Sequence, residues 1–115
     1  MHTPVPEAYE QLLEQEIATV SFAEVETITR MFESKTAHLR VVDQDKHEQA
    51  LQQARSVRAL LDHPEKLTDQ QLLTALAALR YFVRDEDQAE GNEDDALVIQ
   101  AAVNRLQEPL QALQG

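Results

Sequence analysis

The sequence contains no cysteine, no tryptophan and only two glycines. Without cysteine, the chain can form no disulfide, no thiolate metal site and no cysteine nucleophile. With glycine only at Gly91 and Gly115, it lacks the clustered glycines of a phosphate-binding loop. None of its serines lies in a G-x-S-x-G elbow, and no two of its histidines are four residues apart. These absences exclude nucleotide binding by such a loop, serine hydrolysis of that type and an H-E-x-x-H zinc site.

Basic residues are scarce as well. There are 10 Lys and Arg against 21 Asp and Glu, which gives a net charge of −11. Phosphate backbones and anionic lipid surfaces would be repelled by this charge, so we expect no direct nucleic-acid or membrane ligand. No apolar run approaches the length of a membrane span, and the first residues do not resemble a signal peptide. A cytoplasmic protein is therefore expected.

The negative charge is concentrated in two stretches. Residues 1–29 contain six acids and no base, and residues 85–95 contain seven acids and no base. The rest of the chain holds eight acids and ten bases, so it is nearly neutral. The acidity is therefore local, and its location needs an explanation.

The residues that are abundant are strong helix formers. The chain has 15 Leu, 15 Ala and 13 Gln, and 43% of its residues are apolar. At 115 residues, it has the length of one small domain. This composition predicts an all-α fold, a compact bundle of about five helices formed by residues 1–115 as a single domain.

Capping signals and apolar spacing place these helices. The S-x-x-E motif at Ser21 and the T-x-x-Q motif at Thr68 are typical of helix starts, and Pro64 ends the helix before it. The expected helices are 6–19, 21–42, a third that begins after Asp43 or Asp45 and stops at His63, 68–84, and 93–107. We expect 68–84 to be the most buried, and Leu110 and Leu113 to form a short turn after Pro109.

Apolar spacing also predicts which side chains are buried. On the second helix, the buried stripe is expected to consist of Phe22, Val25, Ile28, Met31 and Phe32. On the third helix, Arg55 and Arg58 are expected to face water.

The acidic stretch 85–95 breaks a local rule. Asp85, Glu86 and Asp87 follow the end of a helix, where the helix dipole disfavours carboxylates by roughly 0.3–1 kcal/mol each. We expect Arg80 and Arg84 to offset part of that cost.

A divalent cation is the functional interpretation of this stretch. Asp87, Glu90, Asp94 and Asp95 could supply oxygen ligands to Ca²⁺ or Mg²⁺ around a turn at Gly91. The stretch is not an EF-hand, because Glu90 stands where that loop needs glycine and Ala96 stands where it needs glutamate. A solvated acidic turn, or a docking surface for a basic partner, remains the alternative.

Residues 74–103 resemble the YkvA-like domain of unknown function. In that family, an apolar helix ending in Tyr-Phe leads into a Pro-x-Asp-x-x-Pro-Asp loop, and Gly followed by Asp-Asp-Ala opens the next helix. The matching residues here are Tyr81-Phe82, Asp87 and Gly91-Asn92-Glu93-Asp94-Asp95-Ala96, while Asp85 and Glu90 stand near the positions of the family's loop prolines. The resemblance implies a helical module with Asp87, Asp94 and Asp95 at family-like positions. It brings no established activity, and the polar loop argues against membrane attachment.

Function is predicted in outline only. The leading hypothesis is a non-enzymatic interaction module whose acidic surfaces bind a basic protein partner or mediate self-association, through Glu7, Glu10, Glu14, Asp85 and Glu86. An acidic inhibitor, an immunity protein or a phosphate-backbone mimic belongs to the same class. The alternative is a cation-responsive module with its site in 85–95. An enzyme would need a carboxylate of raised pKa together with a second chemical group, and the sequence shows no such constellation.

Overall fold

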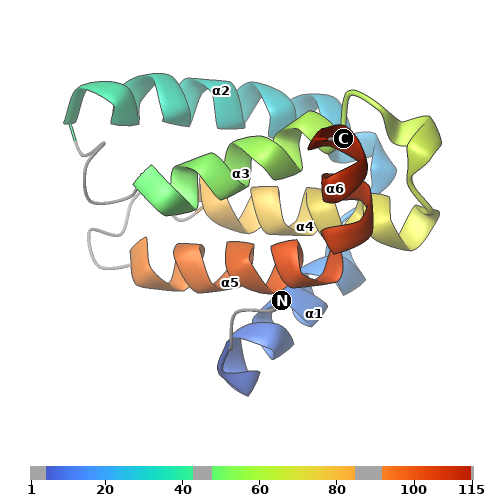
Figure 1. Ribbon diagram of the computed structural model, residues 1–115. Coiled ribbons are helices and arrows are strands. Elements are labelled where there is room, and N and C mark those ends of the chain that lie inside the picture. Colours follow the sequence, from blue (N-terminus) through green and yellow to red (C-terminus); the bar gives the residue numbers. More distant parts are fainter. Residues whose placement is uncertain (1–4, 43–47, 85–91, 115) are drawn as a thin grey trace.

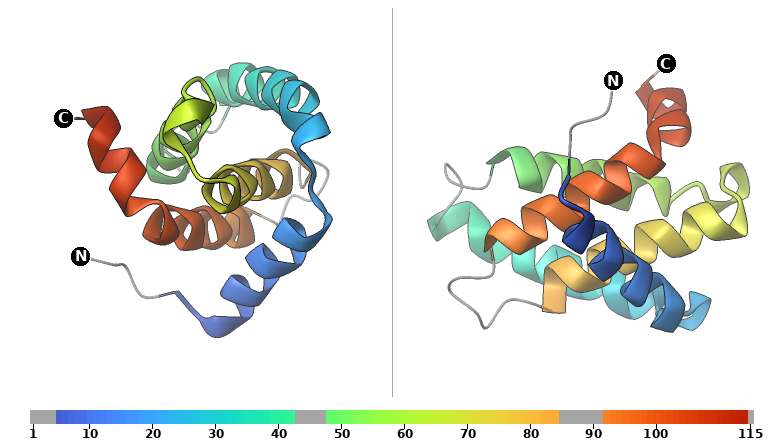
Figure 2. Two further views of the ribbon diagram at one scale, coloured as in Figure 1. Left: turned by 90° about the vertical axis from the view of Figure 1, so that its right-hand side faces the viewer. Right: turned by 90° about the horizontal axis from the view of Figure 1, so that it is seen from below.

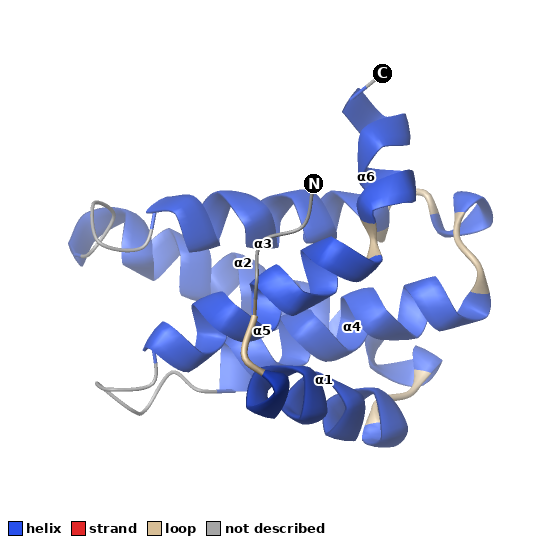
Figure 3. Ribbon diagram, turned by 60° about the horizontal axis from the view of Figure 1, so that its bottom comes forward, coloured by secondary structure: helices blue, strands red, loops and turns tan. Residues whose placement is uncertain are grey.

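The computed structural model describes the backbone of residues 5–42, 48–84 and 92–114, and the side chains of residues 5–37, 51–83 and 97–113 (Figure 1). Helices joined by loops and turns make up this part of the chain, which contains no strand (Figure 3). The predicted all-α bundle is confirmed.

The described residues form six α-helices and two short 3-10 helices. In chain order they are α1 (Glu7–Thr19), η1 (Phe22–Glu24), α2 (Val25–Val42), α3 (Glu48–Leu60), η2 (Pro64–Lys66), α4 (Asp69–Arg84), α5 (Asn92–Arg105) and α6 (Gln107–Gln114).

The two capping motifs form as predicted. The backbone N–H of Ser21 donates to Glu24 Oε2 at 2.9 Å. At the start of α4, the backbone N–H of Thr68 donates to Gln71 Oε1 at 2.9 Å, and the backbone N–H of Gln71 donates to Thr68 Oγ1 at 3.1 Å. Each motif thus satisfies amide groups that a helix start leaves without a partner. The predicted caps Asp43 and Asp45 lie outside the described residues.

Helix α4 is the centre of the bundle, as predicted. Looking along the bundle, α1, α2, α3 and α5 surround it (Figure 2). All five residues from Ala75 to Leu79 are 0% exposed, so this part of α4 is buried on every side. Three of the five are alanines, whose small side chains let the neighbouring helices approach closely. The buried apolar side chains of all six α-helices form one cluster around α4.

Two predicted core residues are exposed. Phe22 is 45% and Met31 is 42% exposed. Phe22 lies in η1, before α2 begins, so it does not share the α-helical spacing of the stripe. On α2, the buried side is centred near Phe32, and Met31 lies about 100° away from it around the helix axis.

Two further expectations need correction. Arg58 does not simply face water, because it makes ion pairs with Asp62 Oδ1 at 2.9 Å and Glu33 Oε1 at 3.4 Å. The residues after 106 form the eight-residue helix α6 instead of a short turn. Pro109 is the third residue of α6, where the backbone N–H has no partner within the helix, so its missing N–H costs nothing there.

Candidate functional site

The predicted site residues fall into two groups. Glu7, Glu10 and Glu14 lie on α1 among the described side chains. All the others lie outside the described side chains, although the backbone of Asp94 and Asp95 belongs to the first turn of α5: Asp85, Glu86, Asp87, Glu90, Asp94 and Asp95.

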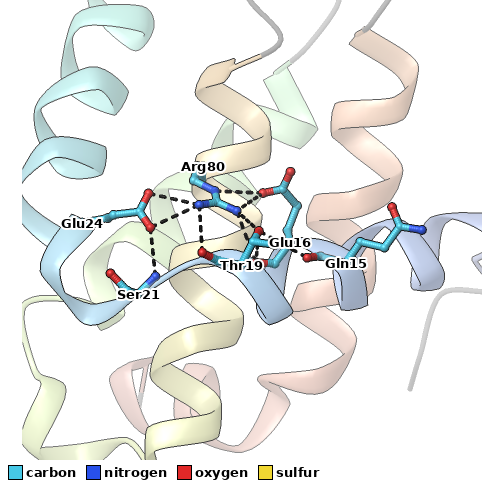
Figure 4. A network of polar contacts seen from close by, with 6 residues as sticks. All are labelled: Gln15, Glu16, Thr19, Ser21, Glu24 and Arg80. Carbon is cyan, nitrogen blue, oxygen red and sulfur yellow. Dashed lines mark hydrogen bonds and ion pairs between the residues drawn. The ribbon is translucent and has the colours of Figure 1, made fainter.

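Arg80 of α4 joins the N-terminal segment to the centre of the bundle (Figure 4). Its Nε donates to Glu16 Oε2 at 2.9 Å, and its Nη1 donates to both carboxylate oxygens of Glu24 at 3.1 Å. Its Nη2 also donates to Thr19 Oγ1 and, at 3.4 Å, to the backbone carbonyl of Glu16. We call Arg80, Glu16, Thr19, Ser21 and Glu24 the Arg80 cluster. Arg80 is thus held by α1 and η1. Residues 85–87, whose charge it was expected to offset in part, lie outside the described residues.

The Arg80 cluster is well shielded from water. The side chains of Arg80 and Glu16 are 17% and 6% exposed, and that of Glu24 is 34% exposed. The backbone N–H of Ser21, and next the guanidinium of Arg80, lower the pKa of Glu24 below its usual value of 4.5. Burial opposes the charge of Arg80, but the hydrogen bonds to Glu16 and Glu24 outweigh it and raise the pKa of Arg80. Both groups are therefore held in their charged forms.

Arg105 engages two of the predicted docking residues. It is the last residue of α5, and its Nη2 lies 2.9 Å from Glu14 Oε1 and 3.2 Å from Glu10 Oε1. A cation at this position also complements the negative end of the α5 dipole. Four of the six acids in residues 1–29 are therefore paired with either Arg80 or Arg105.

Lys35 supplies a positive charge near the end of α4. Its Nζ donates to the backbone carbonyl of Phe82 and lies 4.4 Å from the centroid of the Phe82 ring. Phe82 also packs against Phe32 of α2, with 5.8 Å between the ring centroids. The carbonyl of Phe82 is among the last four of α4, which have no partner within the helix. Lys35 of α2 thus places a favourable positive charge at this helix end, a contact that the sequence did not predict.

Four helix ends lie at one end of the bundle. Helices α2 and α4 end there, at Val42 and Arg84, and α3 and α5 begin there, at Glu48 and Asn92 (Figure 1, left side). We call this the acidic end. The sequence that joins these helix ends and opens α3 and α5, residues 43–48 and 85–95, contains ten of the 21 acids and a single Lys or Arg, Lys46.

A pocket of about 270 Å³ lies where α5 meets α6, beside α3. We call it the glutamine pocket. Residues of all three helices line it: Gln53, Ser56, Val103, Gln107, Leu110 and Gln111. None of them is charged, and Val103 and Leu110 supply apolar surface.

A chain of side-chain amides runs inward from this pocket. Gln53 Nε2 donates to Gln100 Oε1 at 2.6 Å, and Gln100 Nε2 donates to Asn104 Oδ1 at 3.1 Å. Gln100 is only 9% exposed, so its hydrogen bond fixes the orientation of the Gln53 side chain from within the bundle. Nothing in the spacing of the 13 glutamines in the sequence shows which of them meet across three helices.

The described residues offer neither a metal site nor a membrane span. Among the described side chains, no three His, Asp or Glu residues are placed to hold a metal ion. None of the described helices is both long and apolar enough to cross a membrane.

Comparisons of the chain with protein-family models, with curated proteins and with solved structures give no match.

Proposed function

We propose that this protein is an interaction module that binds a basic protein partner at the acidic end. The observation that carries this proposal is the distribution of ion pairs. Arg30, Arg58, Arg80 and Arg105 pair with seven acids of the described helices and turns: Glu10, Glu14, Glu16, Glu24, Glu26, Glu33 and Asp62. The body of the bundle is thereby largely neutralised, whereas residues 43–48 and 85–95 contain ten of the 21 acids in the sequence.

This distribution of ion pairs favours a docking surface at the acidic end over one on α1. Glu10 and Glu14 of α1 are engaged by Arg105, so a partner would have to compete with an existing ion pair there. Asp85 and Glu86 belong to residues 43–48 and 85–95, which contain ten acids and one Lys or Arg and directly follow Arg84 and Val42 in the sequence. Like charges at that density repel one another, and a cationic partner relieves the repulsion while the field of the whole protein speeds its approach.

The experiment compares two triple variants with the same change in net charge. The first is Asp85→Asn, Glu86→Gln and Asp87→Asn at the acidic end. The second is Glu7→Gln, Glu65→Gln and Glu108→Gln, three exposed acids elsewhere. Binding of a fluorescent ten-lysine peptide is measured by anisotropy at low and physiological salt.

We expect the first variant to bind about tenfold more weakly than the wild type and the second to change by less than about twofold. Equal weakening would mean that only net charge matters, which contradicts a local docking surface. Size-exclusion chromatography with light scattering tests self-association, and a dimer that is insensitive to salt would favour apolar self-association over a basic partner.

A further inference from the structure

We infer that the N-terminal segment, residues 5–24, undocks from α4 and α5 in acid while the other helices stay packed. This pH-sensitive switch goes beyond the proposed function and does not depend on it. Its basis is the way in which the segment is held, since carboxylates of the segment face arginines of the bundle.

Four carboxylates of the segment pair with two arginines. Arg80 lies on α4 and Arg105 is the last residue of α5, so the segment is tied to two different helices. The shortest pair is 2.8 Å at Arg80 and 2.9 Å at Arg105. The four pairs are Arg80–Glu16, Arg80–Glu24, Arg105–Glu10 and Arg105–Glu14.

Apolar burial contributes less to α1 than to another helix of equal length. Helix α1 lies on the outside of the bundle, against α4 and α5 (Figure 2). Of its 13 residues, only Leu13 and Glu16 are buried, and the second of these is charged. Helix α3 also has 13 residues, and its described part buries four apolar side chains: Leu51, Ala54, Val57 and Leu60. The docking of α1 therefore depends on charge to a greater degree.

The ion pairs of Arg30 and Arg58 contribute less to packing between helices. Arg30 pairs with Glu26, and Arg58 pairs with Asp62, in each case only four residues away in the chain. Arg58 also pairs with Glu33 of α2, but that pair is longer, at 3.4 Å, and the side chain of Glu33 is 66% exposed. Loss of carboxylate charge therefore weakens the docking of α1 more than the packing of α3 against α2.

The charged groups around the segment place its release in the acid range. Arg80 faces it from α4, and Arg105 faces it from α5. On α2, which η1 contacts, Glu26 and Arg30 pair with each other at 2.7 Å. The one histidine among the described side chains, His63, lies 3.7 Å from a glutamate two residues away in its own turn. The carboxylates are thus the described groups at this interface that take up protons as the pH falls below neutral.

Protonation removes the attraction and leaves the arginine charges in place. The N–H of Ser21 and the guanidinium of Arg80 hold the pKa of Glu24 below its usual 4.5, so this pair persists to lower pH. Once Glu16 and Glu24 are neutral, Arg80 is a cation with a side chain only 17% exposed and with no counter-charge from the segment. A charge in that position favours undocking, because undocking returns it to water.

The helices that remain keep a core of their own. Without α1, α4 still contacts α2, α3 and α5. Ile28 of α2, Val57 of α3 and Ile99 of α5 are each at most 2% exposed and belong to the same cluster as Leu76 of α4. Release of the segment is therefore a local opening that leaves the centre of the bundle intact.

Hydrogen exchange of the full chain, followed by mass spectrometry, tests the switch. Rates are measured at neutral pH and at about pH 4, and each is divided by the intrinsic rate at that pH. An isolated helix of 13 residues is marginal in water, so the amides of α1 lose protection when the segment undocks. We expect protection to fall at least about tenfold more in α1 than in α3. Equal losses in the two helices would mean global unfolding and would overturn the inference.

Two variants imitate acid at neutral pH. Glu10→Gln combined with Glu14→Gln removes the charges that face Arg105, and Glu24→Gln removes one that faces Arg80. We expect each to lower the protection of α1 by about fivefold and that of α3 by less than about twofold. The matched control is Glu7→Gln combined with Glu108→Gln, two exposed acids, and it should change neither.

The variants decide the inference independently of the acid series. If one of them fails to fold, as seen by circular dichroism, the other is used. Wild-type protection of α1 in the folded variants would show that the ion pairs do not hold the segment, and the inference would be wrong. A loss of protection in the control as large as in the variants would attribute the effect to net charge and would overturn it as well.

Discussion

At the scale of residues, Arg80 is the side chain on which most polar contacts converge. It bridges Glu16 of α1 and Glu24 of η1 from a helix at the centre of the bundle. The cluster thus ties the N-terminal segment to the core by charge as well as by packing. Nothing in the sequence distinguishes Arg80 from Arg84 four residues later, because the partners are 64 and 56 residues away.

Replacing Arg80 by methionine should destabilise the fold strongly. Glu16 is only 5% exposed, so Arg80→Met leaves a buried carboxylate without its counter-charge. We expect the free energy of unfolding, measured by urea denaturation, to fall by about 3 kcal/mol. The matched control is Arg30→Met, whose pair with Glu26 has side chains 74% and 84% exposed, and it should cost less than about 0.5 kcal/mol. Similar losses in the two variants would contradict a structural role for the Arg80 cluster.

Glu24 should make stability depend on pH in the acid range. Its pKa in the folded state is below the usual 4.5, so the unfolded chain binds the proton more readily. The stabilisation is therefore complete above about pH 4.5 and is lost as the pH falls through the folded pKa. The gap in unfolding free energy between the wild type and Glu24→Gln should be widest near neutral pH and narrow steadily below about pH 5. A gap that stays constant over a pH series of urea denaturations would rule this out.

At the scale of elements, the helix starts carry local signals that tertiary structure did not alter. The reciprocal hydrogen bonds between Thr68 and Gln71 are an example, since both partners lie within one turn. In the last turn of α4, the carbonyl of Phe82 accepts instead from Lys35 of α2. The caps at helix starts thus involve neighbouring residues, whereas the partner of the Phe82 carbonyl comes from another helix.

Removing one cap should have a moderate effect. Thr68→Ala deletes the hydroxyl that accepts from the N–H of Gln71, and we expect a loss of about 1 kcal/mol in unfolding free energy. Thr27→Ala, at an exposed position inside α2, should leave stability unchanged or raise it slightly, because alanine is the better helix former. Thermal unfolding followed by circular dichroism measures both. The cap has no energetic role if the two substitutions shift the melting temperature equally.

At the scale of the whole molecule, charge and packing are separated in space. The central helix α4 buries Leu76 and Leu79 completely, and the described acids are largely paired on the surrounding helices. Ten of the 21 acids belong to residues 43–48 and 85–95, which connect the helices at the acidic end. A single partner surface at that end would therefore meet most of the uncompensated charge of the protein.

The alternative hypothesis, that the protein binds a divalent cation, stays a prediction. If residues 85–95 bind Ca²⁺ or Mg²⁺, millimolar cation should raise the melting temperature of the wild type, because the ion binds the folded chain. The same addition should leave Asp87→Ala combined with Asp94→Ala unaffected. Thermal scans with and without cation, and with matched ionic strength, compare the two. An equal response of both proteins would exclude a site at these carboxylates.

The sequence by itself determined the fold class, the position of most helices and the identity of the central helix. The physical reason is that capping motifs, proline and the 3.6-residue apolar period act between residues close together in the chain. The sequence predicted the bounds of α1 and the end of α2 closely. The prediction that Met31 is buried was wrong, because burial depends on which side of a helix its neighbours cover.

Only the tertiary structure decided which charges meet and which glutamines form a pocket. Arg80 and Arg105 find their acids across 56 or more residues, and Gln53 reaches Gln100 across 47. Such pairs depend on how the helices pack against one another, and neither composition nor residue spacing predicts that packing. The excess of acids can be counted from the sequence, but the ion pairs that neutralise the described helices appear only when these helices are packed together.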